Sequence, residues 1–174
     1  MNNDYLHYGT TIALIREDQQ IIEDMSDSIC RQDRSHFVNN YKIDKSIKLY
    51  DMNINGFGAE LAFCRLCDVE FDSSTIQSEN HFNNADATLK DGRTVDVKNT
   101  IYPFGKLLVR KGKEKKLVDI YALMIGKFPK FKFSGWSNYK DIIKAETLLS
   151  FKHGYSYCLP QNKLNRILTI NNNE

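Results

Sequence analysis

The chain has little of what marks secreted, membrane or zinc-stabilised proteins. Its 174 residues include four cysteines and three prolines. No stretch approaches the roughly 18 consecutive apolar residues that a membrane-spanning helix needs. The polar start at residues 1–4 is unlike a signal peptide. We therefore expect a cytoplasmic protein with reduced thiols and no membrane association.

The cysteines and histidines are few and scattered. Cys64 and Cys67 have a C-x-x-C spacing, but the sequence offers no second pair at zinc-ligand distance. Phe63 and Leu66 lie beside them on an expected helix, so we interpret both thiols as core packing. The sequence also lacks a plausible Ser/His/Asp or Cys/His set, so a hydrolytic reaction would need a nucleophile other than a side chain.

What the chain does have is the composition of an ordinary globular domain. Hydrophobic residues make up 41% of it and charged residues 26%, and its length suits one domain with a real core. The mixture of helical and strand patterns predicts an α/β fold with a central mixed sheet flanked by helices. We expect an N-terminal helical part at 1–55, a core at 56–160, and a terminal helical turn with a tail at 161–174.

Periodicity and turn signals place the individual elements. Helices are expected at residues 11–31, 58–67 and 137–150, a shorter one within 35–55, and a helical turn at 161–168. Strands are expected at residues 69–71, 106–110, 117–125, 155–159 and 128–133. The last of these should be an edge strand because it contains Pro129. Its phenylalanines alternate with lysines, and we expect the rings to pack in the core.

The most informative segment is residues 84–100, Asn-Ala-Asp-Ala-Thr-Leu-Lys-Asp-Gly-Arg-Thr-Val-Asp-Val-Lys-Asn-Thr. Two short alternating runs flank an Asp-Gly turn signal, which predicts a β-hairpin. Asp86 lies in the first run, whereas Asp96 and Lys98 share one face of the second. Because Asp is depleted from half-buried strands, these charges indicate a site for a hard divalent cation. The alternative is a charged hairpin that faces solvent.

The length of the turn decides whether the two carboxylates can meet. A two-residue loop would place Asp86 and Asp96 on opposite faces of the hairpin. A three-residue loop at 90–92, with Gly92 in the left-handed conformation, would set them directly opposite, with Cβ atoms about 5 Å apart. A cation that bridges the carboxylates would remove their repulsion. We therefore expect the three-residue loop.

Charge is distributed unevenly along the chain. The net charge is +2, but residues 1–97 carry −8 and residues 98–152 carry +9. A basic half beside a carboxylate cluster suits a polyanionic substrate. The expected phosphate-binding residues lie in and around one basic turn, and they are Lys106, Arg110, Lys111, Lys113, Lys115 and Lys116. The alternative is an ordinary solvated turn.

Glu60 is a third acidic candidate. Its helical neighbours at three and four positions are Phe57 and Cys64, so its carboxylate lies in an apolar stripe. Burying the charge alone would cost several kcal/mol. We therefore expect Glu60 at the surface, neutralised or linked to a metal.

Together these residues resemble the PD-(D/E)XK, or restriction-endonuclease-like, nuclease superfamily. Its members carry an acidic residue on a helix, an Asp on a following strand, and (D/E)-x-K on the hairpin partner of that strand. Residues 84–86 (Asn-Ala-Asp) match the PD element, 96–98 (Asp-Val-Lys) match (D/E)-x-K, and 58–60 (Gly-Ala-Glu) match the helical acid. The resemblance covers about residues 56–160, and many small phage-encoded members look similar. The chain departs from the pattern in having no Pro before Asp86.

The resemblance implies a Mg²⁺-dependent DNA nuclease in which Mn²⁺ can substitute. Asp86 and Asp96 would bind one or two ions, helped by the Val97 carbonyl and Glu60. The metal would activate a water and offset the charge on the phosphorane and the leaving 3′ oxygen. Lys98 would orient or deprotonate that water and stabilise the scissile phosphate. If a phage encodes the chain, we expect it to act in the cytoplasm of the host cell.

Two alternatives stay open. A Holliday-junction resolvase or another structure-specific nuclease would act as a homodimer, because it cuts two strands symmetrically. An inactive DNA-binding or phage-structural protein could keep the fold without the chemistry, although the complete acidic set and the lysine favour an enzyme. The sequence leaves endonuclease against exonuclease action, and DNA against RNA, undecided.

Overall fold

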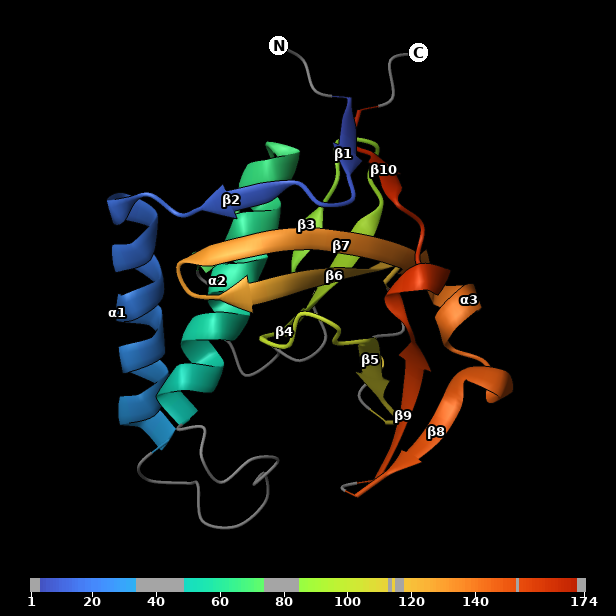
Figure 1. Cartoon of the computed structure of the whole chain (residues 1–174). Coiled ribbons are helices and arrows are strands. Elements are labelled where there is room, and N and C mark those ends of the chain that lie inside the picture. The colour runs from blue at the N-terminus through green and yellow to red at the C-terminus, as the bar shows by residue number, and fades with distance from the viewer. Residues whose placement is uncertain are drawn as a thin grey trace.

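A five-stranded mixed sheet forms the centre of the molecule, in the order β2-β7-β6-β4-β3 (Figure 1). The pair β4–β6 is parallel and the other neighbours are antiparallel. A second sheet has the order β5-β9-β8, and β1 pairs with β10. The computed structural model describes residues 4–33, 49–73, 85–112, 114, 118–152 and 154–171.

The helices are α1 (Arg16–Asp33), α2 (Leu49–Cys67) and α3 (Tyr139–Ile142), with short 3₁₀ helices at Ala145–Thr147 and Gln161–Lys163. The strands of the central sheet are β2 (Thr11–Ala13), β3 (Ala87–Thr88), β4 (Thr94–Thr100), β6 (Ile120–Lys127) and β7 (Lys130–Asn138). The remaining strands are β1 (Tyr5–His7), β5 (Leu107–Arg110), β8 (Leu148–Phe151), β9 (Gly154–Leu159) and β10 (Ile167–Thr169).

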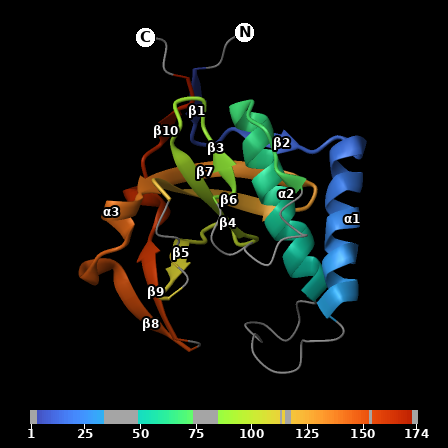
Figure 2. The same ribbon diagram turned by 180° about the vertical axis from the view of Figure 1, so that it is seen from behind.

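The two faces of the central sheet belong to different cores. Side chains at alternate positions of β6, such as Ala122 and Met124, pack with α1 and α2 in the larger cluster. The intervening ones, such as Tyr121 and Leu123, pack against β5, β9 and α3 in the smaller cluster. In Figures 1 and 2, α1 and α2 lie on one side of the molecule, and α3 with β5, β9 and β8 lies on the other. The chain is a single α/β domain whose mixed sheet is covered on both faces, as predicted.

Several predicted strands are confirmed. The segments 106–110, 117–125 and 155–159 correspond to β5, β6 and β9. The phenylalanines Phe131 and Phe133 are buried in the larger cluster, as their alternation indicated. The predicted free thiols are also confirmed for Cys30, Cys64, Cys67 and Cys158.

The two long helices begin elsewhere than predicted. Helix α1 starts at Arg16 rather than at residue 11, because Thr11–Ala13 pair with β7 and form an edge strand. Helix α2 starts at Leu49, so Gly56 and Gly58 lie inside it. A Cβ at Gly58 would lie 3.0 Å from the rings of Phe128 and Phe131. The sequence predicts that the helix begins near Gly58. The reason for a glycine here is instead the close packing of the helix on the sheet, which leaves no room for a side chain.

Four further predictions are wrong because tertiary pairing overrides local preference. Residues 69–71 are not a strand. Strand β7 lies between β2 and β6 rather than at an edge, and Pro129 sits in the preceding turn, after a cis peptide bond. The predicted helix at 137–150 is the end of β7, short helical turns and β8, because β8 pairs with β9. The turn at 161–168 is helical only at Gln161–Lys163.

Most of the segment within which the shorter helix was expected, residues 35–55, lies outside the described part of the chain. None of the described helices is both long and apolar enough to cross a lipid bilayer.

Candidate functional site

The β3–β4 hairpin has the predicted three-residue turn. Leu89 N–H donates to the Arg93 carbonyl at 2.9 Å, and Gly92 N–H donates to the Leu89 carbonyl at 2.9 Å. Gly92 has a φ of +85°, which is the left-handed conformation that glycine adopts at little cost. The strands pair Ala87 with Val95. The register expected from the sequence is therefore confirmed.

The ladder ends at the pair Ala87–Val95, and Asp86, the residue before it, donates from its own N–H to the Val95 carbonyl at 2.9 Å. The Asp86 carboxylate accepts a hydrogen bond from Val97 N–H at 2.7 Å. Within a strand, the N–H and C=O of one residue point to the same side. The carbonyl of Val97 is therefore directed toward Asp86 as well, past the end of the short strand β3. The Asp86 carboxylate therefore lies against Val97, the residue between Asp96 and Lys98, where the hairpin strands end their pairing.

Asp96 and Lys98 form an ion pair on the face of β4 that points away from α2. Lys98 Nζ lies 2.6 Å from Asp96 Oδ1; the aspartate side chain is 0% exposed, whereas that of the lysine is 31% exposed. Their neighbours across the parallel pair are Tyr121 and Leu123 of β6, both in the smaller cluster. A buried carboxylate is stable only with such a partner. Lys98 therefore balances the charge of the buried Asp96, while part of the lysine side chain remains accessible to solvent.

The hairpin is tied to the rest of the domain by polar contacts. Lys90 forms an ion pair with Asp68 at the end of α2, at 2.7 Å, and Arg93 donates to the Thr169 carbonyl of β10 at 2.6 Å. At the start of β4, Thr94 donates from its N–H and hydroxyl to Asp119 Oδ2, each at 2.9 Å. These hydrogen bonds hold the pKa of Asp119 below its usual value. The strand that carries Asp96 is thereby fixed at its first residue.

Glu60 is not gathered with the other two carboxylates. It lies on α2, which covers the opposite face of the sheet, four residues before Cys64. The Cys64 thiol lies 4.0 Å from the Asp86 carbonyl oxygen. Burial, together with the nearby charges of Glu60 and Asp86, raises the pKa of the Cys64 thiol to about 12. Glu60 and Asp86 thus share the surroundings of one thiol, but the described residues contain no group of three His, Cys, Asp or Glu side chains placed to hold a metal ion.

The donors at the hairpin still fit a hard divalent cation by their chemistry. Asp86, Asp96 and the Val97 carbonyl offer oxygen atoms only. Mg²⁺ keeps several water ligands and is commonly held by one or two carboxylates together with substrate phosphates, rather than by a full protein cage. A pair of facing aspartates is therefore a sufficient protein contribution for Mg²⁺, whereas it would be a poor one for zinc.

Three of the predicted phosphate-binding residues, Lys106, Arg110 and Lys111, lie in the described part of the chain, in or beside strand β5. That strand is hydrogen bonded to β9 in the second sheet. Along β5, Leu107 and Val109 face the smaller core, so Lys106 and Arg110 take the outward positions. Lys111 follows, with its Nζ 5.9 Å from the centre of the Tyr155 ring. The other predicted residues, Lys113, Lys115 and Lys116, lie outside the described part of the chain.

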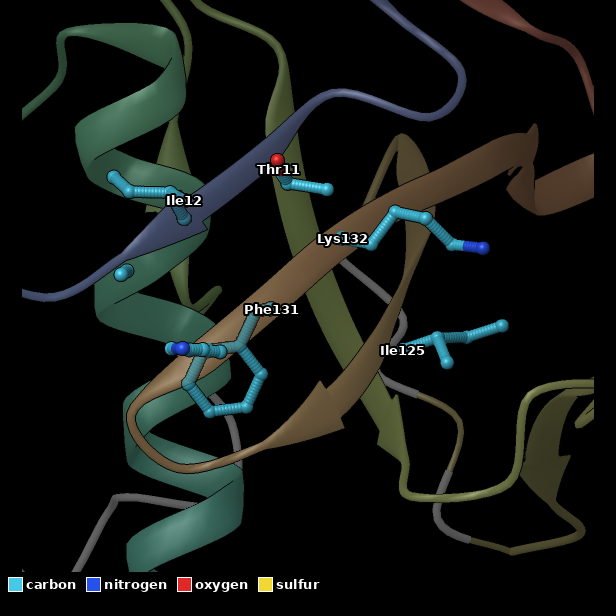
Figure 3. Close-up of a pocket in the computed structure, with 7 residues that line it drawn as sticks. Thr11, Ile12, Ile125, Phe131 and Lys132 are labelled. Atoms are coloured by element: carbon cyan, nitrogen blue, oxygen red, sulfur yellow. The ribbon is translucent and has the colours of Figure 1, made fainter.

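The structure reveals other cations on the face of Asp96. Thr100 pairs with Ile125, Ile125 with Lys132, and Lys132 with Thr11, so these side chains share the face that carries Asp96 and Lys98. Lys127 and Lys130 pair with each other on the same face. A pocket of about 370 Å³ is lined by Thr11, Ile125, Lys130 and Lys132 among other residues, and Figure 3 labels Thr11, Ile125 and Lys132 in it. The signal was present in the sequence, since lysines alternate there with phenylalanines that pack on the other face.

No curated protein matches the chain. A family model matches residues 7–132, which include helix α2, the β3–β4 hairpin and the two following strands up to the first residues of β7. The match extends over more than half of the chain, and the protein belongs to DUF5843, a family of unknown function.

Proposed function

We propose that this protein is a divalent-metal-dependent nuclease that hydrolyses phosphodiester bonds in DNA within the cytoplasm. The observation that carries the proposal is the hairpin contact in which the Asp86 carboxylate accepts a hydrogen bond from Val97 N–H, between Asp96 and Lys98 on β4. The same residues carry the resemblance to the PD-(D/E)XK nucleases. A packing role explains them poorly, because Asp is depleted from strands.

In the proposed site, Asp86, Asp96 and the Val97 carbonyl would hold Mg²⁺ or Mn²⁺. The bound ion would supply Lewis acidity toward the scissile phosphate and acidify a coordinated water. Glu60 is left out of this ligand set, because the described structure does not bring it into a group with the two aspartates. Its proposed role is limited to the negative potential around Asp86.

Lys98 has the position that the chemistry requires of a cation. Its Nζ reaches from the buried Asp96 toward solvent, where a substrate phosphate would approach. There it can donate hydrogen bonds to a nonbridging phosphate oxygen, stabilise the negative charge that develops in the transition state, and orient the attacking water. The lysines of β6 and β7 on the same face supply further phosphate contacts along the strand.

A second candidate is a DNA-binding protein without catalysis. The specific observation in its favour is that Asp96 is fully buried and already bonded to Lys98. In this alternative the ion pair stabilises the smaller core, and the lysine-rich face binds DNA without cutting it. The two candidates share the binding surface and differ only in whether the aspartates act on the phosphate.

Cleavage assays on purified full-length protein distinguish the two. We expect Mg²⁺ or Mn²⁺ to support cleavage of at least one member of a panel of linear, circular, single-stranded and branched DNAs, with RNA as a parallel substrate. Ca²⁺ should support binding with little or no turnover, because it binds the same oxygen ligands in a looser shell. Asp96→Asn should be inactive, whereas Asp141→Asn on the exposed helix α3 should be active. Undiminished cleavage without a divalent ion, or by Asp96→Asn, would contradict the proposal; binding without cleavage under all conditions would favour the second candidate.

A further inference from the structure

The connection between β4 and β5 (Figure 1) carries aromatic residues whose side chains are exposed to solvent. Phe104 is 94% exposed and Tyr102 is 59% exposed. Phe104 has the largest exposed fraction of the big apolar side chains in the described residues. A phenylalanine fully in water loses the free energy that burial would give it, about 1.5–3 kcal/mol. An aromatic ring in this position therefore indicates a surface that a partner covers.

The turn that presents Phe104 is held in one conformation. Gly105 N–H donates to the Tyr102 carbonyl at 2.9 Å, which closes a four-residue β-turn. Pro103 occupies the second position of this turn, where its ring fixes φ in advance. Phe104 is the third residue and lies at the tip. The tip is therefore a preorganised projection, and little conformational entropy would be lost if its ring were covered.

Two further contacts fix the turn to the domain. The Gln161 side-chain amide donates to the carbonyls of Pro103 and Gly105, both at 2.9 Å. On the other side, Tyr102 N–H donates to the Thr100 hydroxyl at 3.3 Å. A Cβ at Gly105 would lie 2.3 Å from Thr100 Cγ2, so the turn packs directly on the last residue of β4. The exposed ring thus has a fixed place relative to β4.

The position of the turn identifies the kind of partner. Asp96, Lys98 and Thr100 share one face of β4, and the turn follows Thr100 immediately. Lys106, which is exposed, comes directly after the turn. Aromatic rings beside cations are how single-stranded nucleic acids are bound, since the bases stack on the rings and the phosphates pair with the cations. A single-stranded polynucleotide matches both features, because its bases can stack on the aromatic rings and its phosphates can pair with the cations.

We propose that Phe104, assisted by Tyr102, stacks on an unpaired base of the polynucleotide whose backbone is bound at Asp86 and Asp96. This inference rests on the proposed function, because it assumes a nucleic acid at the hairpin. Gln161 is a positioning residue that holds the turn for this contact. The protein should therefore prefer single strands, or duplexes with unpaired or frayed bases, over intact duplexes.

Binding without catalysis tests the inference. Fluorescence anisotropy and the emission of a 2-aminopurine base would be measured in Ca²⁺ buffer, which should support binding with little or no turnover. The probes are a 12-nucleotide single strand, a matched duplex and a single strand of abasic sites. We expect Phe104→Ala to weaken binding of the normal single strand by roughly 5- to 150-fold, with a much smaller effect on the other two probes. It should also abolish the quenching of 2-aminopurine. Phe151→Ala, which removes another exposed phenylalanine (42% exposed) on β8, is the matched control and should be neutral.

Gln161→Ala supplies a second variant that leaves both rings in place. It should weaken single-strand binding less than Phe104→Ala does and reduce, but not abolish, the 2-aminopurine quenching.

Equal losses on all three probes, or equal losses in Phe104→Ala and Phe151→Ala, would overturn the inference. So would a change from dimer to monomer in Phe104→Ala with unchanged DNA affinity, because the partner would then be a second copy of the chain. Wild-type protein that cleaves DNA while Phe104→Ala binds normally would refute only the stacking role, whereas wild-type protein that binds no probe would refute the proposed function too.

Discussion

The two faces of strand β4 have opposite characters, although their residues alternate along seven positions. Val95 and Val97 are buried on the side of α2, within the larger apolar cluster. Asp96 and Lys98 lie on the other side, toward the second sheet. The side of α2 follows the ordinary rule for a covered sheet. The other side places a charge pair where apolar residues would pack without a desolvation cost.

The two faces have different roles under the proposed function. Replacing a buried ion pair by apolar residues of similar size is often neutral or stabilising. In that proposal Asp96 and Lys98 serve the bound ligand, whereas Val95 and Val97 serve the stability of the domain. Substitutions on the two faces should separate these roles.

The largest expected effect is that of Asp96→Asn. It should lower the cleavage rate by about 10³-fold or more, because the stabilisation that a metal gives a transition state amounts to several kcal/mol. DNA affinity should be unchanged or slightly higher, since one negative charge is removed from a basic surface. Single-turnover cleavage and anisotropy on the same preparation measure both quantities. Parallel losses of affinity and rate would show that Asp96 does not have the separate role assigned to it.

Lys98→Met should lower the cleavage rate by about 10²-fold while a metal still binds. It should also destabilise the domain by about 2 kcal/mol, because it leaves Asp96 buried without its partner; the partial exposure of Lys98 reduces that cost. The double variant Asp96→Asn/Lys98→Met should recover stability but not activity. Urea unfolding beside the cleavage assay distinguishes the two effects. If the double variant is as unstable as Lys98→Met, the ion pair with Asp96 is not the way in which Lys98 stabilises the domain.

The lysines on the Asp96 face should matter for binding rather than for chemistry. Lys130→Ala combined with Lys132→Ala should weaken DNA binding by roughly 10-fold and lower the slope of log affinity against log salt by up to about two. The control pair Lys140→Ala and Lys163→Ala removes the same charge from exposed positions elsewhere. Equal effects of both pairs would indicate that net charge, and not this face, binds the DNA.

Val95→Ala is the counterpart on the apolar face. It should destabilise the domain by about 2 kcal/mol, because Val95 is 0% exposed and packs in the larger cluster. The cleavage rate at a temperature well below the unfolding transition should be unchanged. Urea unfolding and a cleavage assay at 15–20 °C below that transition provide the two readings. A large loss of rate in the stable, folded variant would break the distinction between the faces.

The smallest effect concerns acid stability at the start of β4. Because its hydrogen bonds with Thr94 hold the folded pKa of Asp119 below the ordinary 3.8, its stabilising contribution is complete above that value. It is lost as the pH falls through the folded pKa. The difference in melting temperature between the wild type and Asp119→Asn should therefore become smaller as the pH is lowered from 6 toward 3. A constant difference across this range would show that Asp119 makes no pH-dependent contribution to stability.

The hairpin shows how far local sequence can determine a site. The Asp-Gly signal, the alternation of residues and the left-handed requirement at Gly92 together specify a register, and all three are properties of a few consecutive residues. The left-handed Gly92 and the pairing of Ala87 with Val95 agree with that register. The strands at 106–110 and 155–159 were predictable for the same reason, since they are short apolar runs between turn signals. The relation between the hairpin and those strands was not.

Pairing between distant segments decided the rest. The local sequence predicts that Thr11–Ala13 begin a helix, but they form a strand because they pair with β7. Residues 148–151 likewise form a strand because they pair with β9. No local pattern states that β5 joins a second sheet. The surroundings of Lys106 and Arg110 therefore depend on the pairing of β5 with β9, which only the structure shows. Those errors concern contacts between residues far apart in sequence, whose energies do not appear in any window of the chain.

The sequence by itself determined an α/β domain, the hairpin with its three-residue turn, and the identity of the charged residues on it, because turn geometry and strand alternation act over neighbouring residues. Only the tertiary structure decided that Asp96 is buried against Lys98, that Glu60 lies on the other side of the sheet, and that Lys127, Lys130 and Lys132 share the face of Asp96. Burial and shared faces depend on which strands become neighbours, and that choice is made by the packing of the whole chain.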